Sequence, residues 1–138
     1  MTNRKKENAL ILSQEEIASG IFSLWLKTEA AGQARPGQFI SMYTNDGSRL
    51  LPRPISICEI DRGREALRVV YRVTGPDTGT ELFSKMKAGD AIPVIGPLGN
   101  GFPMERAEGK RVFLIGGGIG VPPIVELAEQ LKCAHNTY

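Results

Sequence analysis

The chain contains few of the residues that hold metal ions: two cysteines and one histidine among 138 residues. Cys58 and Cys133 lie far apart, with no CxxC pair and no cluster of cysteines and histidines. A structural zinc site needs four such ligands, and an iron–sulfur cluster is usually held by four. We therefore predict no metal site in this chain, and we expect both cysteines to be reduced thiols of a cytoplasmic protein.

Long runs of like-charged residues and long runs of apolar residues are also absent. No block of five or more like charges occurs, and 17 Lys and Arg stand against 15 Asp and Glu, for a net charge of +2. Nucleic-acid surfaces need clustered Lys and Arg, so neither nucleic acid nor a charged membrane surface is indicated as a partner. No apolar run approaches the roughly 18 residues of a membrane span. Hydrophobic residues still make up 41% of the chain, enough for a globular core.

Alternating apolar and polar residues, which are typical of half-buried β-strands, dominate the first hundred positions. In residues 20–27, for example, Phe22, Leu24 and Leu26 share one face. Residues 13–16 also fit a helix cap, but the alternation around them predicts a strand instead. Strands are predicted at residues 8–17, 20–27, 38–43, 55–60, 67–73 and 91–95. Six strands with one short helix indicate a mainly β fold, a small closed antiparallel barrel of Greek-key type without exposed sheet edges.

The one short helix is predicted just after residue 78. Thr78 and Glu81 fit a capping box, in which a threonine hydroxyl accepts from the third helical N–H group. Leu82, Phe83 and Met86 then follow at helical spacing.

The pattern changes beyond residue 103. The all-apolar residues 112–115 predict a buried strand, a glycine cluster follows, and then a helix with an apolar stripe (Val121, Ile124, Val125, Ala128 and Leu131). A strand, a glycine loop and a helix open an α/β nucleotide-binding domain. We predict a β-barrel domain at residues 1–103 and the beginning of an incomplete α/β domain at 104–138. Since a parallel sheet needs further strands, we expect one exposed strand edge and an uncovered helix face.

Two segments of the barrel sequence suit phosphate groups. In Arg53-Pro54-Ile55-Ser56, the arginine can hold a phosphate with two parallel hydrogen bonds and the serine offers a small donor and acceptor. The alternative is a surface arginine before an edge proline. Residues 75–80 place glycines and a helix start together, which suits a pyrophosphate. A plain loop before a capped helix is the alternative there.

Two glycine-rich segments follow. Gly116, Gly117, Gly118 and Gly120 depart from the G-x-G-x-x-G pattern, yet they lie between a predicted strand and a predicted helix. Four glycines in five residues cost conformational entropy on folding, which favours a ligand loop over a plain turn. Residues 96–102 could let the backbone approach a flat ring, or they could be an interdomain linker.

The order of these motifs is similar to that of a known superfamily. RPISI, VVYRV, a Gly-Thr pair before a helix, GPLGNGF and LIGGGIGVPP follow one another as in the ferredoxin-reductase superfamily. Within it, the chain most resembles the electron-transfer subunits of NAD-dependent (type B) dihydroorotate dehydrogenase. The resemblance spans nearly the whole chain, and GPLGNGF joined to GGGIGVPP is its most family-specific part.

The resemblance implies the positions of the cofactors. In that family the Arg-Pro-x-Ser arginine meets an FAD phosphate, the serine lies near the reactive edge of the isoalloxazine, and the glycine loop is where NAD(H) approaches. Many superfamily members stack a tyrosine on the flavin where this chain has Ile55. No protein general base is implied, because hydride transfer to flavin needs none. The implied cofactor-binding residues are Arg53, Pro54, Ile55, Ser56, Val70, Tyr71, Arg72, Gly79, Thr80, Gly116, Gly117, Gly118 and Gly120.

The resemblance also implies a function. Electrons would pass from NADH through FAD and a [2Fe–2S] cluster to the FMN-containing dihydroorotate dehydrogenase catalytic subunit, in a cytoplasmic heterotetramer of pyrimidine biosynthesis. Family members hold the cluster in a cysteine-rich segment that this chain does not contain. The acidic residue expected about 20 positions beyond the glycine loop would fall at the end of the chain. We therefore expect these 138 residues to bind FAD measurably, to bind NADH poorly and not to be fully active alone.

Two other functions fit the same sequence. One is a ferredoxin–NAD(P) reductase or the diaphorase subunit of a hydrogenase, distinguished by the catalytic subunit with which the chain co-purifies. The other is a non-catalytic β-barrel binding module, which a flavin absorption spectrum would exclude.

Overall fold

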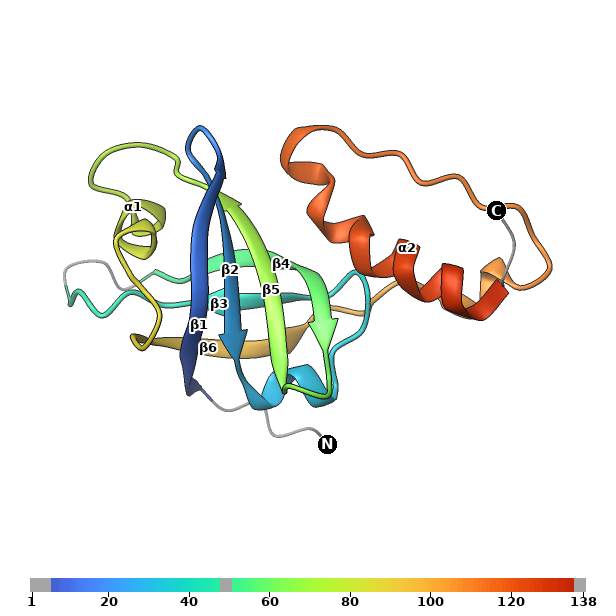
Figure 1. The fold of residues 1–138 in the computed structure, drawn as a ribbon, viewed down its shortest axis with the longest axis horizontal. Helices are drawn as coiled ribbons and strands as arrows, with labels where there is room; N and C mark the ends of the chain where they lie inside the picture. The colour runs from blue at the N-terminus through green and yellow to red at the C-terminus, as the bar shows by residue number, and fades with distance from the viewer. Residues whose placement is uncertain (1–5, 48–50, 136–138) are drawn as a thin grey trace.

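A closed barrel of six antiparallel strands makes up most of the computed structural model, which describes residues 6–47 and 51–135 (Figure 1). β3, β4 and β5 are consecutive neighbours, and β6 returns beside β3, which is Greek-key order. All six predicted strands are confirmed. Their bounds are β1 (Glu7–Ala18), β2 (Ile21–Lys27), β3 (Phe39–Met42), β4 (Arg53–Asp61), β5 (Ala66–Arg72) and β6 (Ala91–Leu98).

The alternation along each strand divides the barrel into an interior and an outer face. Leu24 pairs with Val69 and Leu26 with Leu67, and all four side chains are fully buried. The residues between them, such as Arg68, face outward. Because the sheet closes on itself, every strand has two neighbours and no edge is left unpaired.

Helix α1 (Gly79–Ser84) covers one side of the barrel and α2 (Pro122–His135) lies on the opposite side (Figure 1). The predicted cap of α1 is confirmed: the hydroxyl oxygen of Thr78 accepts from the Glu81 N–H at 3.3 Å. Phe83 of α1 is buried in the barrel core, with its ring edge-on to Tyr71. The short 3-10 turns are η1 (Glu29–Gly32), η2 (Met104–Ala107) and η3 (Gly118–Gly120).

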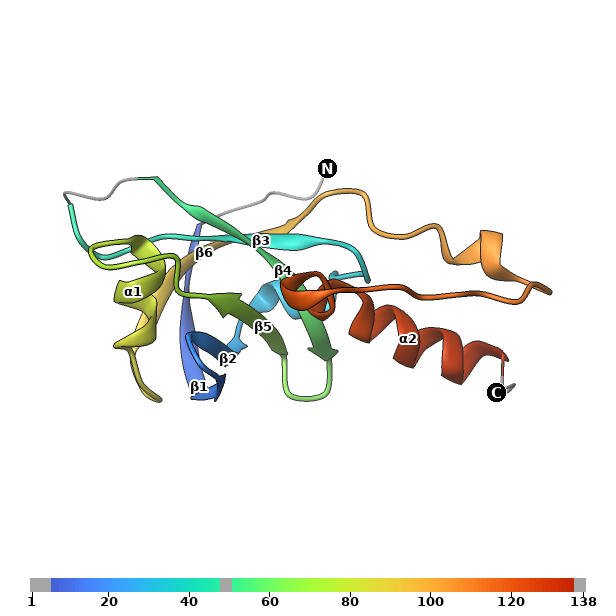
Figure 2. The same cartoon turned by 90° about the horizontal axis from the view of Figure 1, so that it is seen from above.

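The predicted strand at residues 112–115 is wrong for this structure. The segment leaves the barrel, extends past η2 and returns alongside α2 without pairing with any described strand (Figures 1 and 2). Its four apolar side chains are exposed, Ile115 by 91%. A strand is defined by hydrogen bonds to a neighbour, and the closed barrel offers no edge to supply them. The predicted strand edge is therefore an extended segment without ladder bonds.

Helix α2 packs on the outer face of β4 through Glu126 and Leu127, both buried. A carboxylate oxygen of Glu126 accepts from the backbone N–H of Ile60 at 3.0 Å, which fastens the helix to the strand. The residues of the predicted apolar stripe are half-buried or exposed, and Leu131 of the stripe lines the same cleft as Leu127. The boundary at residue 103 stays a prediction. No helix among the described residues is long and apolar enough to cross a membrane.

Candidate functional site

Arg53 and Gly79 come from different elements and meet beside the start of α1. A methyl group built on Gly79 would lie 3.4 Å from Nε of Arg53 and 3.5 Å from the Thr44 methyl carbon. An added methyl at position 79 would thus be in ordinary van der Waals contact with Arg53, which places the arginine side chain directly beside the start of α1. Arg53 is half-buried and forms no ion pair with any residue that the structure describes. The fold thus holds a guanidinium against the backbone of the predicted pyrophosphate turn.

Thr80 contributes to this turn through its backbone. Its hydroxyl accepts from the Thr74 N–H at 3.0 Å and lies 3.0 Å from the Thr78 hydroxyl. The Thr80 side chain is buried, so these internal bonds occupy it. Hydrogen bonds among Thr74, Thr78 and Thr80 therefore stabilise this loop. The groups that remain available to bind a ligand are backbone N–H groups.

Ser56 lies on the outer face of the barrel, next to the inward-facing pair Ile57 and Val69. Val70 of the neighbouring strand faces the same way for the same reason. Ile55, by contrast, packs against the barrel core and offers no aromatic ring. Pro54 is exposed on the same outer face. Pro54, Ser56 and Val70 of these two adjacent strands thus share the outer face, although Val70 is covered there and only 7% exposed.

Tyr71 does not present its side chain to this surface. Its ring is 1% exposed, stacks on Phe22 and donates its hydroxyl hydrogen to Oε1 of Gln14 at 2.6 Å. Burial raises the pKa of the Tyr71 hydroxyl far above its ordinary value. The implied contact of Tyr71 with a cofactor is therefore confined to its backbone groups.

Arg72 lies beside the glycine loop. A methyl group on Gly118, which has a φ of +55°, would approach Nη2 of Arg72 at 4.0 Å. Gly116 packs tightly, since an added methyl would meet Ile124 at 3.0 Å. At Gly117 and Gly120 an added methyl would meet nothing within 4 Å. The fold itself therefore does not require glycine at those two positions, which is consistent with a loop that a ligand approaches.

The glycines of residues 96–102 are explained by packing within the barrel. A methyl on Gly96 would lie 2.6 Å from Ile40, and one on Gly99 would lie 3.3 Å from the Phe39 ring. The Gln38 amide donates to the Gly99 carbonyl at 2.8 Å. Close packing against β3 therefore accounts for Gly96 and Gly99. Neither an approach to a flat ring nor an interdomain linker is needed to explain these two glycines.

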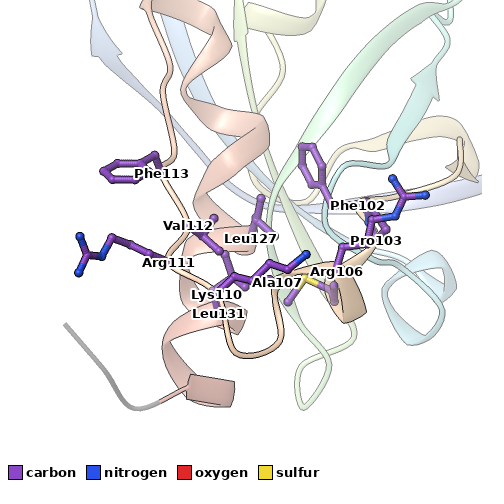
Figure 3. Close-up of a pocket in the computed structure, with 11 residues that line it drawn as sticks. Phe102, Pro103, Arg106, Ala107, Lys110, Arg111, Val112, Phe113, Leu127 and Leu131 are labelled. Carbon is purple, nitrogen blue, oxygen red and sulfur yellow. The ribbon is translucent and has the colours of Figure 1, made fainter.

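A cleft of about 460 Å³ opens between α2 and the segment that precedes it (Figure 3). None of the predicted cofactor-binding residues lines it. Phe113 points away from the rest of the group in Figure 3. The cleft therefore belongs to the apolar surface around α2, and its charged lining residues, Arg106, Lys110 and Arg111, are all basic. It is lined by Phe102, Pro103, Met104, Arg106, Ala107, Lys110, Arg111, Val112, Phe113, Leu127 and Leu131.

Sequence reasoning missed two polar residues that hold the site together. Glu126 fastens α2, and hence the glycine loop before it, to β4. Gln14 bonds α1 to the barrel through its amide group. The sequence does hint that Glu126 is buried, because its neighbours Val125 and Leu127 are apolar. No such hint exists for Gln14, because the β-bulge between Ile11 and Ser13 changes which side chains of β1 face inward.

The two cysteines differ in environment. Cys58 of β4 is 2% exposed, and burial raises the pKa of its thiol to about 11. Cys133, near the end of α2, is exposed. Among the described residues, no group of three or more His, Cys, Asp or Glu side chains is placed to hold a metal ion.

We expect a thiol-specific disulfide reagent at pH 8 to modify one cysteine per folded chain. The raised pKa keeps Cys58 neutral at this pH, and burial denies the reagent access, whereas Cys133 is accessible. The measurement is the number of thiols titrated before and after denaturation, expected to rise from one to two. A Cys133→Ser variant is the control and should show none while folded. Rapid modification of Cys58 in the folded chain would contradict its placement.

Comparison with known proteins supplies close relatives of this chain, although no family model matches it. The chain is 45% identical over 127 residues to the electron transfer subunit of dihydroorotate dehydrogenase B (NAD(+)) of Streptococcus mutans. It is 45% identical over 131 residues to that of Enterococcus faecalis. These matches cover 91% and 94% of this chain but only 48% and 49% of the relatives. The chain thus spans about half the length of the curated relatives it matches.

Solved structures show the same barrel. An NADH-dependent reduced ferredoxin-NADP oxidoreductase superposes with a TM-score of 0.77 at 27% identity, over 95% of this chain and 46% of that chain. The ferredoxin reductase of carbazole 1,9a-dioxygenase gives 0.81 at 20% identity, over 96% and 40%. A ferredoxin NADP+ reductase from Neisseria gonorrhoeae, solved with FAD and NADP, gives 0.71 at 20% identity, over 94% and 52%. The last two show the fold alone.

The barrel order and its neighbours define a domain with the fold of the ferredoxin reductases. Within that class, the chain is a homologue of the electron transfer subunits of dihydroorotate dehydrogenase B over most of its length. The resemblance noted in the motifs is thereby confirmed.

Proposed function

We propose that this chain binds FAD along the outer face of β4 and β5. The pyrophosphate lies between the Arg53 guanidinium and the backbone of Gly79 and Thr80, and the ring lies beside Ser56 and Val70. The observation that carries the proposal is the approach of the Arg53 side chain to Gly79, because a guanidinium beside the start of a helix suits an anion. A solved ferredoxin NADP+ reductase with the same fold contains bound FAD, which is consistent with the proposal.

The residues of the chain then have separate tasks. Arg53 neutralises phosphate charge, the braced threonine loop presents backbone donors, and Ser56 offers a hydroxyl close to the ring. The loop at Gly116, Gly117, Gly118 and Gly120 leaves room for NAD(H), and Arg72 lies at its border. FAD, when bound, supplies the chemistry of accepting a hydride and releasing electrons singly.

We further propose that the chain is part of an oxidoreductase that passes electrons from NADH through FAD to a dihydroorotate dehydrogenase catalytic subunit that contains FMN, in the cytoplasm. The names of the relatives support that partner and the pyrimidine pathway. A [2Fe–2S] cluster does not fit the residues of this chain, because Cys58 and Cys133 are its only cysteines and one of them is buried. A cluster on this route would require ligands from outside these 138 residues.

A ferredoxin–NAD(P) reductase is the second candidate. The solved oxidoreductase at 27% identity, which uses ferredoxin and NADP, favours it. Affinity capture from the source cells decides between the two. A dihydroorotate dehydrogenase catalytic subunit among the captured proteins supports the first function, and a ferredoxin in its place supports the second.

FAD binding is tested on the 138-residue chain itself. We expect titration with FAD to produce a saturable, stoichiometric complex with the visible absorption bands of a bound flavin and altered flavin fluorescence. A matched titration with riboflavin, which has no phosphate, should bind more weakly because Arg53 and the turn at Gly79 then lack a partner. A chain that leaves the FAD spectrum unchanged would overturn the proposal and favour a non-catalytic binding module.

A further inference from the structure

Helix α1 carries two of the proposed phosphate-site residues but has only six residues. Isolated helices of this length are not stable in water. The position of α1 on the barrel therefore depends on tertiary contacts. One contact is Phe83, buried in the core, and the others are hydrogen bonds from the barrel to the end of the helix that lies away from Gly79.

Gln14 makes those hydrogen bonds. Its Nε2 donates to the Phe83 carbonyl at 2.9 Å and to the Met86 carbonyl at 2.7 Å. Its Oε1 accepts from the Tyr71 hydroxyl at 2.6 Å. Both amide hydrogens and one side of the amide oxygen are thus occupied, so the amide has a single orientation. Tyr71 is itself fixed in the core, packed between Phe22 and Phe83.

We propose that Gln14, oriented by Tyr71, is a positioning residue for the phosphate site: it holds α1 on the barrel so that Gly79 stays against Arg53. The inference rests on the proposed FAD function and adds to it a residue that touches no ligand. Of the two carbonyls it binds, that of Phe83 is in the last turn of α1 and that of Met86 lies two residues beyond the helix, whereas the Arg53 contact is at the N-terminal end. Because six residues form a rigid unit of less than two turns, fixing one end fixes the other.

The test combines two substitutions. Gln14→Met has a similar shape but can neither donate nor accept these hydrogen bonds. We expect it to raise the Kd for FAD about tenfold, the effect of losing one to two hydrogen bonds. In an Arg53→Ala background the same change should raise the Kd by less than about threefold, because the contact that Gln14 maintains is already lost. Hydrogen exchange should accelerate at the α1 amides while the barrel strands keep their protection.

The outcomes separate this inference from the function on which it rests. A merely structural role predicts equal fold-changes in both backgrounds, or faster exchange throughout the barrel, and either result overturns the proposal. An unchanged Kd in Gln14→Met, with Arg53→Ala still weakening FAD, overturns this inference alone. A parent chain that binds no FAD overturns both.

Two further variants complete the experiment. Glu15→Gln changes the exposed neighbour of Gln14 on β1 and should leave FAD affinity and exchange unaltered. Tyr71→Phe keeps the ring in the core and removes only the hydroxyl that orients Gln14. It should raise the Kd for FAD about threefold with the same local pattern of exchange. If Gln14→Met does not fold, Tyr71→Phe carries the same comparison in the two backgrounds, and equal fold-changes there overturn the proposal.

Discussion

Replacing Arg53 by alanine is expected to weaken FAD binding by about 1.5–3 kcal/mol, roughly a 10- to 150-fold rise in Kd. The guanidinium lies against Gly79 and is the charged group of the proposed phosphate site. Its loss removes charge-assisted hydrogen bonds, which are about twice as strong as neutral ones. The measurement is titration of FAD into the folded variant, with folding verified by thermal denaturation.

Two variants make the Arg53 result specific. Arg111→Ala removes an exposed arginine from the segment beside α2 and should leave the Kd unchanged. Arg53→Lys keeps the charge but loses the planar fork, so an intermediate affinity is expected. A Kd for Arg53→Ala equal to that of the parent would remove this residue from the site.

Phe83→Ala is expected to lower the free energy of unfolding by about 3–5 kcal/mol, the range for truncating a buried phenylalanine. The ring is 1% exposed and packs edge-on against Tyr71, with centroids 6.2 Å apart. Its removal leaves a cavity where α1 meets the barrel. Denaturant unfolding at equilibrium measures the loss.

The matched control is the same substitution at Phe113, which is 78% exposed. Phe113→Ala should change the free energy of unfolding by less than about 0.5 kcal/mol, as exposed sites usually do. A comparable loss at both positions would mean that the segment around Phe113 is covered in solution, contrary to this structure.

The strands and the cap of α1 were predictable because the sequence patterns that indicate them involve residues close together in the chain. Period-two alternation marks residues 20–27 as a strand with one buried face, and β2 has that face in the core. Thr78 and Glu81 are three residues apart, so the Thr78 hydroxyl meets the Glu81 N–H group once this segment is helical. The cap pattern at residues 13–16 forms no helix, since the alternation continues through it and β1 pairs with β2 there.

The strand expected at residues 112–115 shows the limit of such signals. Four consecutive apolar residues favour burial, but a strand also needs a neighbouring strand with free N–H and C=O groups. That neighbour is a property of the whole fold. The closed barrel has none to offer, and the segment is extended and exposed.

For the candidate site, the sequence identified the residue types but not the contacts that each residue makes. Residue chemistry predicted that Arg53 and Gly79 suit phosphate groups, and the family resemblance predicted Ser56 near a flavin. Neither could show that the Thr80 hydroxyl forms hydrogen bonds within its own loop or that the Tyr71 ring is buried. The sequence also left residues 96–102 undecided, although packing against β3 accounts for two of their glycines.

By itself, then, the sequence determined the six strands, the capped helix and the motifs of a ferredoxin reductase-type protein, since each depends on residues close together in the chain. The tertiary structure decided which of them meet. Arg53 reaches Gly79 because Phe83 and Gln14 dock α1, and Arg72 reaches Gly118 because Glu126 fastens α2 to β4. These contacts join residues far apart in sequence, and barrel closure with a bulge in β1 sets them, which no local pattern records.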